Sequence, residues 1–345
     1  MSRISRYQYS IDRFIQTKSS LISISEHNRP HLDFMYDDFD HLIAICLVSI
    51  LNNKCKKAKL KFHGYYIASG IDIALAIAKV TDNYEYYKKK IGMLGVSNYL
   101  PELVSIMYQS LSGNIDSLKL NATIDNTMRI SQYCINYMSD KIGGLTIVTD
   151  YSQTDRIQKT DFADYKFSKP SHKHKYKHFK KVPHNSLMKL IDDKYGSVCK
   201  MSLIFGWMLG LGDEKELPEL EMMGKHMGII FKIAYDFANI ENDLEHCTDY
   251  TYNIVINRGI KESVEIFFDS KARFVEGILK LDIWSTTLKE ILDLIEKNID
   301  DALEKTNIDE KYNFSEFSST DVLSEKSKKH DAKKGNLVKV IKLPD

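Results

Sequence analysis

The sequence is poor in the residues that make turns. Its 345 residues include only 16 glycines and 6 prolines. An all-β protein needs many tight turns, and glycine and proline are prominent in them. The scarcity of both favours a mainly helical protein. No stretch of the chain shows a convincing strand pattern.

Cysteine pairs, long apolar runs and net charge are also lacking. The five cysteines are odd in number and form no Cys-x-x-Cys pair, which argues against a disulfide framework or a zinc site. The apolar run Leu42–Leu51 is too short to cross a membrane, and the first residues show no apolar segment of a secretory signal. We therefore expect a cytoplasmic protein with reduced thiols. The net charge of +1 argues against an obligate nucleic-acid-binding protein.

Apolar segments of helical length recur along the chain and predict one large all-α bundle, in which sites are built from side chains on facing helices. We expect residues 31–305 to form this bundle, residues 1–30 to be an N-terminal extension, and residues 306–345 to be a disordered tail. The expected helices are Phe34–Leu51, Phe62–Val80, Glu102–Leu111, Thr123–Ile142, Ser186–Leu211, Glu219–Asp249, Tyr252–Phe268 and Lys271–Glu304.

A polar and basic segment, residues 149–185, separates the expected helices. It lacks helical periodicity, so we predict a long insert or loop. Histidines and lysines alternate in residues 172–181, and the lysines would repel a transition metal that the histidines could otherwise bind. The simplest interpretation is a solvated basic loop. The alternative is a salt-sensitive contact with an anionic surface.

Polar residues share one face of the expected helix Glu219–Asp249. Most of this helix is apolar, but a polar residue recurs at steps of seven, four, three and four, at Lys225, Lys232, Asp236, Asn239 and Asp243. Buried charge is costly unless it is paired or used. The stripe therefore predicts a charge network or a cavity wall. The alternative for Lys232 and Asp236 is an i, i+4 ion pair that stabilises the helix.

Several short features of residues 186–258 occur in a recognisable order. They are a Lys-Tyr-Gly element at Lys194, the glycines Gly224 and Gly228, and a Phe-Lys-Ile-Ala-Tyr-Asp run that ends at Asp236. Their order and spacing resemble the C-terminal half of the trans-polyprenyl diphosphate synthases, the family of the FPP and GGPP synthases. The resemblance implies the isoprenoid synthase fold. It also implies a homodimer, or a heterodimer with another synthase.

The resemblance further implies isoprenoid chain elongation, in which isopentenyl diphosphate attacks the carbocation formed from an allylic diphosphate. In that family, carboxylates on two facing helices hold Mg²⁺ on the diphosphate, and basic side chains take up the remaining charge. By motif position, Asp236, Lys232 and Lys194 are the implied catalytic or diphosphate-facing residues. Asp236, Asn239 and Asp243 are the implied metal ligands, and isoprenyl diphosphates are the implied substrates.

The chain departs from the family pattern at its aspartate-rich motifs. The second motif reads Tyr235, Asp236 and Asn239, and Lys232 replaces its preceding glutamine. The first motif is expected within Leu100–Asp116, where no Asp-Asp-x-x-Asp occurs. One carboxylate and an asparagine lack the charge to hold diphosphate-bound metals tightly.

Three functions are compatible with this pattern. The first is a divergent polyprenyl diphosphate synthase with weakened activity. The second is a catalytically inactive subunit or binding protein of the same fold, in which Lys232 places a positive charge where the metal would lie. The third is a terpene-cyclase-like lyase, supported by Asn242-Asp243-Leu244, although a surface-exposed helix end is the simpler interpretation of Asp243. The loss of carboxylates favours reduced or absent turnover.

Overall fold

The structure is a computed structural model that describes residues 41–54, 58–118, 124–148, 165–176, 179–246 and 250–304. The predicted extension, residues 1–30, and the predicted tail, residues 306–345, lie outside these described residues. So do residues 149–164 of the predicted insert. The proposed division into extension, bundle and tail therefore stays a prediction.

Helices make up the regular structure of the described residues, which confirms the all-α prediction. The one pairing of strand type recorded among those residues is an isolated parallel bridge between Lys180 and Tyr250. The helical elements are α3 (Leu42–Lys54), α4 (Ala58–Asp82), α5 (Tyr84–Leu118), α6 (Ile124–Thr146), α7 (Pro170–Tyr176), α8 (His184–Ile191), the π-helical turn η1 (Asp192–Gly196), α9 (Ser197–Leu209), the 3-10 turn η2 (Glu214–Glu216), α10 (Leu217–Ala238), α11 (Ile240–His246), α12 (Ile254–Arg258), α13 (Ile260–Lys280) and α14 (Thr286–Leu303).

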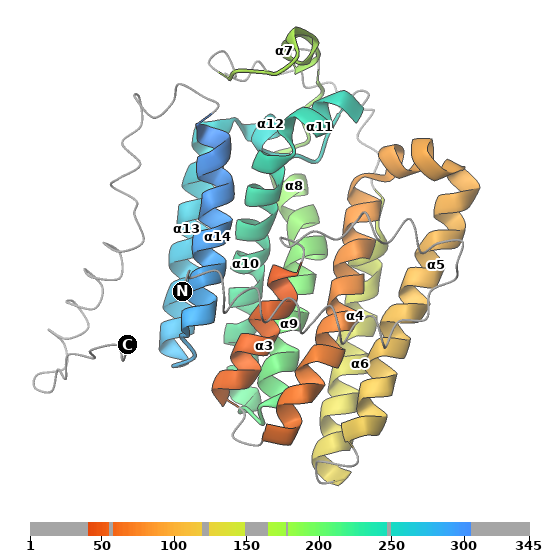
Figure 1. Cartoon of the computed structure of the whole chain (residues 1–345), viewed down its shortest axis with the longest axis vertical. Coiled ribbons are helices and arrows are strands. Elements are labelled where there is room, and N and C mark those ends of the chain that lie inside the picture. Colours follow the sequence, from red (N-terminus) through yellow and green to blue (C-terminus); the bar gives the residue numbers. More distant parts are fainter. Residues whose placement is uncertain are drawn as a thin grey trace, which may run out of the picture.

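The long helices run side by side along the longest axis of the molecule, and the short helices α7, α11 and α12 gather at one end (Figure 1). Helix α10 has the central position, because it packs against α9, α13, α14, α12 and η1. Helix α9 is buried along almost its whole length. None of the helices in the described part of the chain has the length and apolar character needed to cross a bilayer.

Two glycines let α10 approach its neighbours at backbone distance. A Cβ atom on Gly228 would lie 2.4 Å from the amide nitrogen of Gly196, and one on Gly224 would lie 2.6 Å from the Cα atom of Lys200. Only a residue without a side chain fits such close contacts. Since Lys232 lies one turn beyond Gly228, the contact with Gly196 also brings Lys232 close to η1.

The predicted helix Glu219–Asp249 is interrupted in the structure. Helix α10 ends at Ala238, and Asn239 has φ −109° and ψ 11°, outside the helical range. The side-chain amide of Asn239 donates a hydrogen bond to the Tyr235 carbonyl oxygen at 2.8 Å, and this bond caps the helix end. A new helix, α11, then starts at Ile240. The single-helix prediction was wrong because side-chain capping at one residue competes with helix continuation.

Other boundaries differ for backbone reasons. Helix α5 contains Pro101 in its interior instead of beginning there, and its break falls at Gly92, where φ is 77°. This positive φ is accessible to glycine at little cost. Helix α6 continues through Gly143 and Gly144 to Thr146, past its expected end. The predicted insert includes the short helix α7.

Candidate functional site

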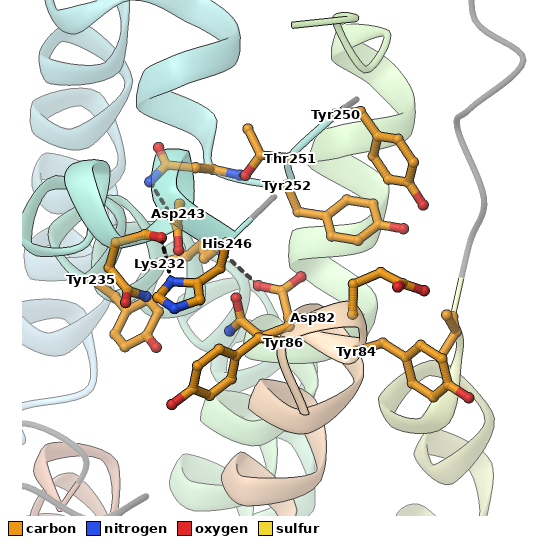
Figure 2. Close-up of a pocket in the computed structure, with 15 residues that line it drawn as sticks. Asp82, Tyr84, Tyr86, Lys232, Tyr235, Asp243, His246, Tyr250, Thr251 and Tyr252 are labelled. Carbon is orange, nitrogen blue, oxygen red and sulfur yellow. Dashed lines mark hydrogen bonds and ion pairs between the residues drawn. The ribbon is translucent and has the colours of Figure 1, made fainter. Parts of the chain in front are cut away.

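A buried ion bridge joins α4 to α10 at the end of the bundle where the short helices gather. The Lys232 Nζ atom lies 2.5 Å from Asp82 Oδ2 and 2.8 Å from Asp236 Oδ1. All three side chains are buried, with Asp236 fully shielded from solvent. Figure 2 shows Asp82 and Lys232 pointing toward one another from their two helices.

The π-helical turn η1 adds a second lysine and a tyrosine to this bridge. Lys194 Nζ donates to Thr81 Oγ1 at 3.0 Å and lies 3.9 Å from Asp82 Oδ1. The Tyr195 hydroxyl donates to Asp82 Oδ2 at 2.9 Å. Asp82 therefore accepts from both Lys232 and Tyr195 and is neutralised by two ammonium groups. Short π-helical segments inside helices are frequent at functional sites.

The loop that precedes α12 closes the network on its other side. The Ile254 amide donates to Asp236 Oδ2 at 2.7 Å, so Asp236 binds the first turn of α12 as well as Lys232. The Asn253 side chain donates to Asp243 Oδ2 and to the Asp236 carbonyl oxygen, each at 2.8 Å. Asp82 and Asp236 thus share Lys232, and the Asn253 side chain links Asp243 of α11 to this network.

Burial and charge shift the ionisation of these groups in opposite directions. Burial lowers the pKa of Lys232, but Asp236 and Asp82 outweigh this effect and raise it above its ordinary value. Burial raises the pKa of Asp82, but Lys232 and Lys194 reverse the shift and lower it. Both groups of this pair are therefore charged at neutral pH.

Asp236 and the outer groups of the network are less well compensated, since burial raises the pKa of Asp236 and Lys232 opposes this shift only in part. Burial raises the pKa of Asp243 to about 6, although the Asn253 hydrogen bond opposes this shift. Burial lowers the pKa of Lys194 to about 8, although Asp82 opposes it.

A largely enclosed pocket of about 80 Å³ opens beside Lys232. Its wall includes Asp82, Lys232 and Asp243 from the network and several tyrosines. Tyr250 and Tyr252 lie next to each other on one side of the view in Figure 2. The two rings are 5.6 Å apart and meet at 73°.

Comparison with known proteins identifies the fold. No family model and no curated protein matches the sequence. A protein from Marinomonas sp. MED121 assigned as a farnesyl-diphosphate synthase matches with a TM-score of 0.54 and 11% sequence identity, over 86% of this chain and 99% of that chain. The apo FPP/GFPP synthase of Zymomonas mobilis matches with a TM-score of 0.52 and 10% identity, over 86% and 99% of the two chains. This chain has the isoprenoid synthase fold. At these identities the likeness establishes the fold alone.

The residues at this site do not fit the Mg²⁺ ions that the synthases of this fold imply. A metal ion between α4 and α10 would need free carboxylate oxygens from both helices. Here the Lys232 ammonium group lies between Asp82 and Asp236 and binds both. In the part of the chain that the structure describes, no group of three or more histidine, cysteine, aspartate or glutamate side chains is arranged to hold a metal ion.

The predicted site residues are only partly brought together. Lys232, Asp236 and Asp243 belong to the buried network, and Lys232 and Asp243 also line the pocket. Lys194 joins the network from η1 but is not part of the pocket wall. Asn239 caps α10 instead of joining the other polar groups.

The sequence reasoning missed the carboxylate that faces α10. It is Asp82 at the end of α4, not a residue of Leu100–Asp116. Thr81, Asp82 and Glu85 stand at the spacing of an Asp-Asp-x-x-Asp motif, and Asp82 and Glu85 both line the pocket. The feature of the sequence that could have indicated Asp82 is its position, since it is an aspartate at the end of the apolar segment that forms α4.

Proposed function

We propose that this chain is a polyprenyl diphosphate synthase-like protein that has lost metal-dependent chain elongation and acts as a non-catalytic binding protein. The observation that carries the proposal is the Lys232 ammonium group, held between Asp82 and Asp236. It supplies locally the positive charge that a bound Mg²⁺ would otherwise bring to two facing carboxylates.

The energetics of this bridge oppose displacement by a metal. A buried ammonium group that leaves two carboxylates must find other acceptors, and breaking a buried ion pair typically costs about 3–5 kcal/mol. Lys232 is 3% exposed, so its departure would require repacking of the interior. Magnesium also gives up its hydration water reluctantly. Both costs favour the lysine-bridged state.

The charge of the pocket supports the same conclusion. Among the residues of its wall, Asp82, Glu85 and Asp243 are acidic, and Lys232 carries the one lysine ammonium group. A diphosphate is itself a multiply charged anion, so without metal ions it would be repelled by this wall.

Weakened chain elongation is the second candidate, and one observation favours it. Carboxylates from α4, α5 and α11 (Asp82, Glu85 and Asp243) still line one pocket, as a diphosphate–metal site requires. In this case Lys232 would have to move aside when substrate and Mg²⁺ bind.

An elongation assay separates the two candidates. The full chain is incubated with isopentenyl diphosphate, Mg²⁺ and, in turn, dimethylallyl, geranyl or farnesyl diphosphate, beside an active synthase as positive control. The proposed function predicts no elongated product. A product that disappears in Asp236→Asn would overturn it, because that variant keeps an acceptor for the Ile254 amide while removing the charge.

The assembly and its partners remain proposals. The synthase resemblance favours a homodimer or a heterodimer with an active synthase, and a non-catalytic chain would fit the second arrangement. Isoprenyl diphosphates remain the expected ligands only if elongation is detected. Contact of residues 172–181 with an anionic surface also stays a prediction, to be checked by salt-dependent vesicle binding.

A further inference from the structure

The wall of the pocket beside Lys232 has more acidic than basic groups. Asp82 is already paired with Lys232, whereas Asp243 accepts a hydrogen bond from the neutral Asn253 amide. Glu85, on the rim, is half exposed and pairs with Lys88 at 3.2 Å. His246 is the remaining base of the wall. Of the three acidic groups of the wall, Asp82 and Glu85 are each paired with a lysine, which leaves the Asp243 carboxylate as the group that favours a positively charged ligand.

Aromatic rings of the pocket offer a second kind of contact to a positively charged ligand. Tyr250 and Tyr252 form two walls at nearly a right angle, with ring centroids 5.6 Å apart. Two other contacts place lysine ammonium groups of the chain itself beside rings of this pocket. Lys232 Nζ lies 5.7 Å from the Tyr235 ring centroid, and Lys194 Nζ lies 5.8 Å from that of Tyr252. A cation within about 6 Å of a tyrosine ring is attracted by the ring quadrupole.

The size of the pocket restricts the ligand further. The enclosed space is about 80 Å³, and one water molecule needs only about 10–15 Å³ on this measure. The pocket can therefore take a small organic group in place of several water molecules.

We propose that this pocket binds the methylated ammonium group of a small organic cation, held in the corner formed by the Tyr250 and Tyr252 rings and charge-compensated by Asp243. The inference rests on the proposed function, because a pocket that assembled Mg²⁺ and diphosphate would select anions. A methylated ammonium ion suits such a pocket because its charge is spread over apolar surface that packs on aromatic rings.

The test is isothermal titration calorimetry on the full chain without added metal. The probes are choline, its uncharged carbon isostere 3,3-dimethylbutan-1-ol, and inorganic diphosphate. Choline and the isostere differ in charge but have nearly the same shape. We expect choline to bind at least 10-fold more tightly than the isostere, and diphosphate to show no saturable binding.

A matched pair of variants locates the binding site. Tyr250 is partly exposed, so its substitution is compatible with folding. Tyr250→Phe keeps the ring and should change choline affinity by less than about 3-fold. Tyr250→Leu removes the ring and should weaken binding about 5- to 30-fold, the range for loss of a cation–π contact.

Three results of these titrations would contradict the proposed binding of an organic cation. Equal affinity for choline and its isostere, tighter binding of diphosphate, or equal losses in Tyr250→Phe and Tyr250→Leu would each overturn the proposal. The first two comparisons use the unmodified chain, so a misfolded variant cannot obscure them. If choline does not bind and the elongation assay is also negative, this inference fails while the proposed function stands. Elongated product would instead overturn the proposed function.

Discussion

Replacing Lys232 with methionine should destabilise the protein strongly. The change removes the ammonium group and keeps a side chain of similar length, so it leaves two buried carboxylates without their shared partner. Asp82 would retain Lys194 at 3.9 Å and the Tyr195 hydroxyl at 2.9 Å, whereas Asp236 would retain the Ile254 amide. Breaking a buried ion pair from one side costs about 3–5 kcal/mol, and we expect a loss of unfolding free energy in this range.

The measurement is urea-induced unfolding of the variant at pH 7 and pH 4.5. Lys225→Met is the control, because Lys225 is exposed on the same helix and its substitution should change stability by less than about 0.5 kcal/mol. Lys232 lowers the pKa of Asp82 in the native protein. In Lys232→Met that pKa should rise, so protonation should recover part of the lost stability as the pH falls. Equal effects of the two substitutions, or a loss that grows at pH 4.5, would refute the ion-bridge account.

Three further changes probe the surroundings of the bridge, each by urea-induced unfolding. The pKa of Asp243 is raised from 3.8 to about 6, so its folded form takes up a proton before the unfolded chain does. Wild type should therefore gain about 2 kcal/mol relative to Asp243→Asn between pH 7 and pH 4.5, and a pH-independent difference would contradict this. Gly228→Ala should cost about 1–3 kcal/mol because its Cβ would meet the Gly196 backbone, whereas Gly143→Ala, with nothing within 4 Å, should be neutral or stabilising. Tyr195→Phe should lose about 1.5–3 kcal/mol with its hydrogen bond to Asp82, and no loss would show that this bond is dispensable.

The fold was predictable because its causes are local and repeated along the chain. The scarcity of glycine and proline and the recurrence of apolar helical segments indicated an all-α bundle, and the polar stripe of the expected helix Glu219–Asp249 included Lys232, Asp236 and Asp243, which the structure brings into one network. The glycines that carried the resemblance also have a packing reason, since Gly228 meets the backbone of Gly196.

The remaining features depend on contacts that sequence periodicity does not encode. Asp82 faces α10 only because the bundle brings together residues 150 positions apart. Asn239 sits at the right spacing for a ligand, yet its side chain ends the helix instead. Lys225 shares the periodicity of Lys232, yet it is exposed where Lys232 is buried.

In the function proposed for this chain, Lys232 takes the place of the metal between Asp82 and Asp236. The most direct test of this role is a Mn²⁺ titration of the unmodified chain in the presence of inorganic diphosphate, followed by electron paramagnetic resonance of free Mn²⁺. The account predicts no saturable binding, because the carboxylate oxygens that would bind the metal already accept the Lys232 ammonium group. Saturable Mn²⁺ binding that is lost in Asp82→Asn would contradict it.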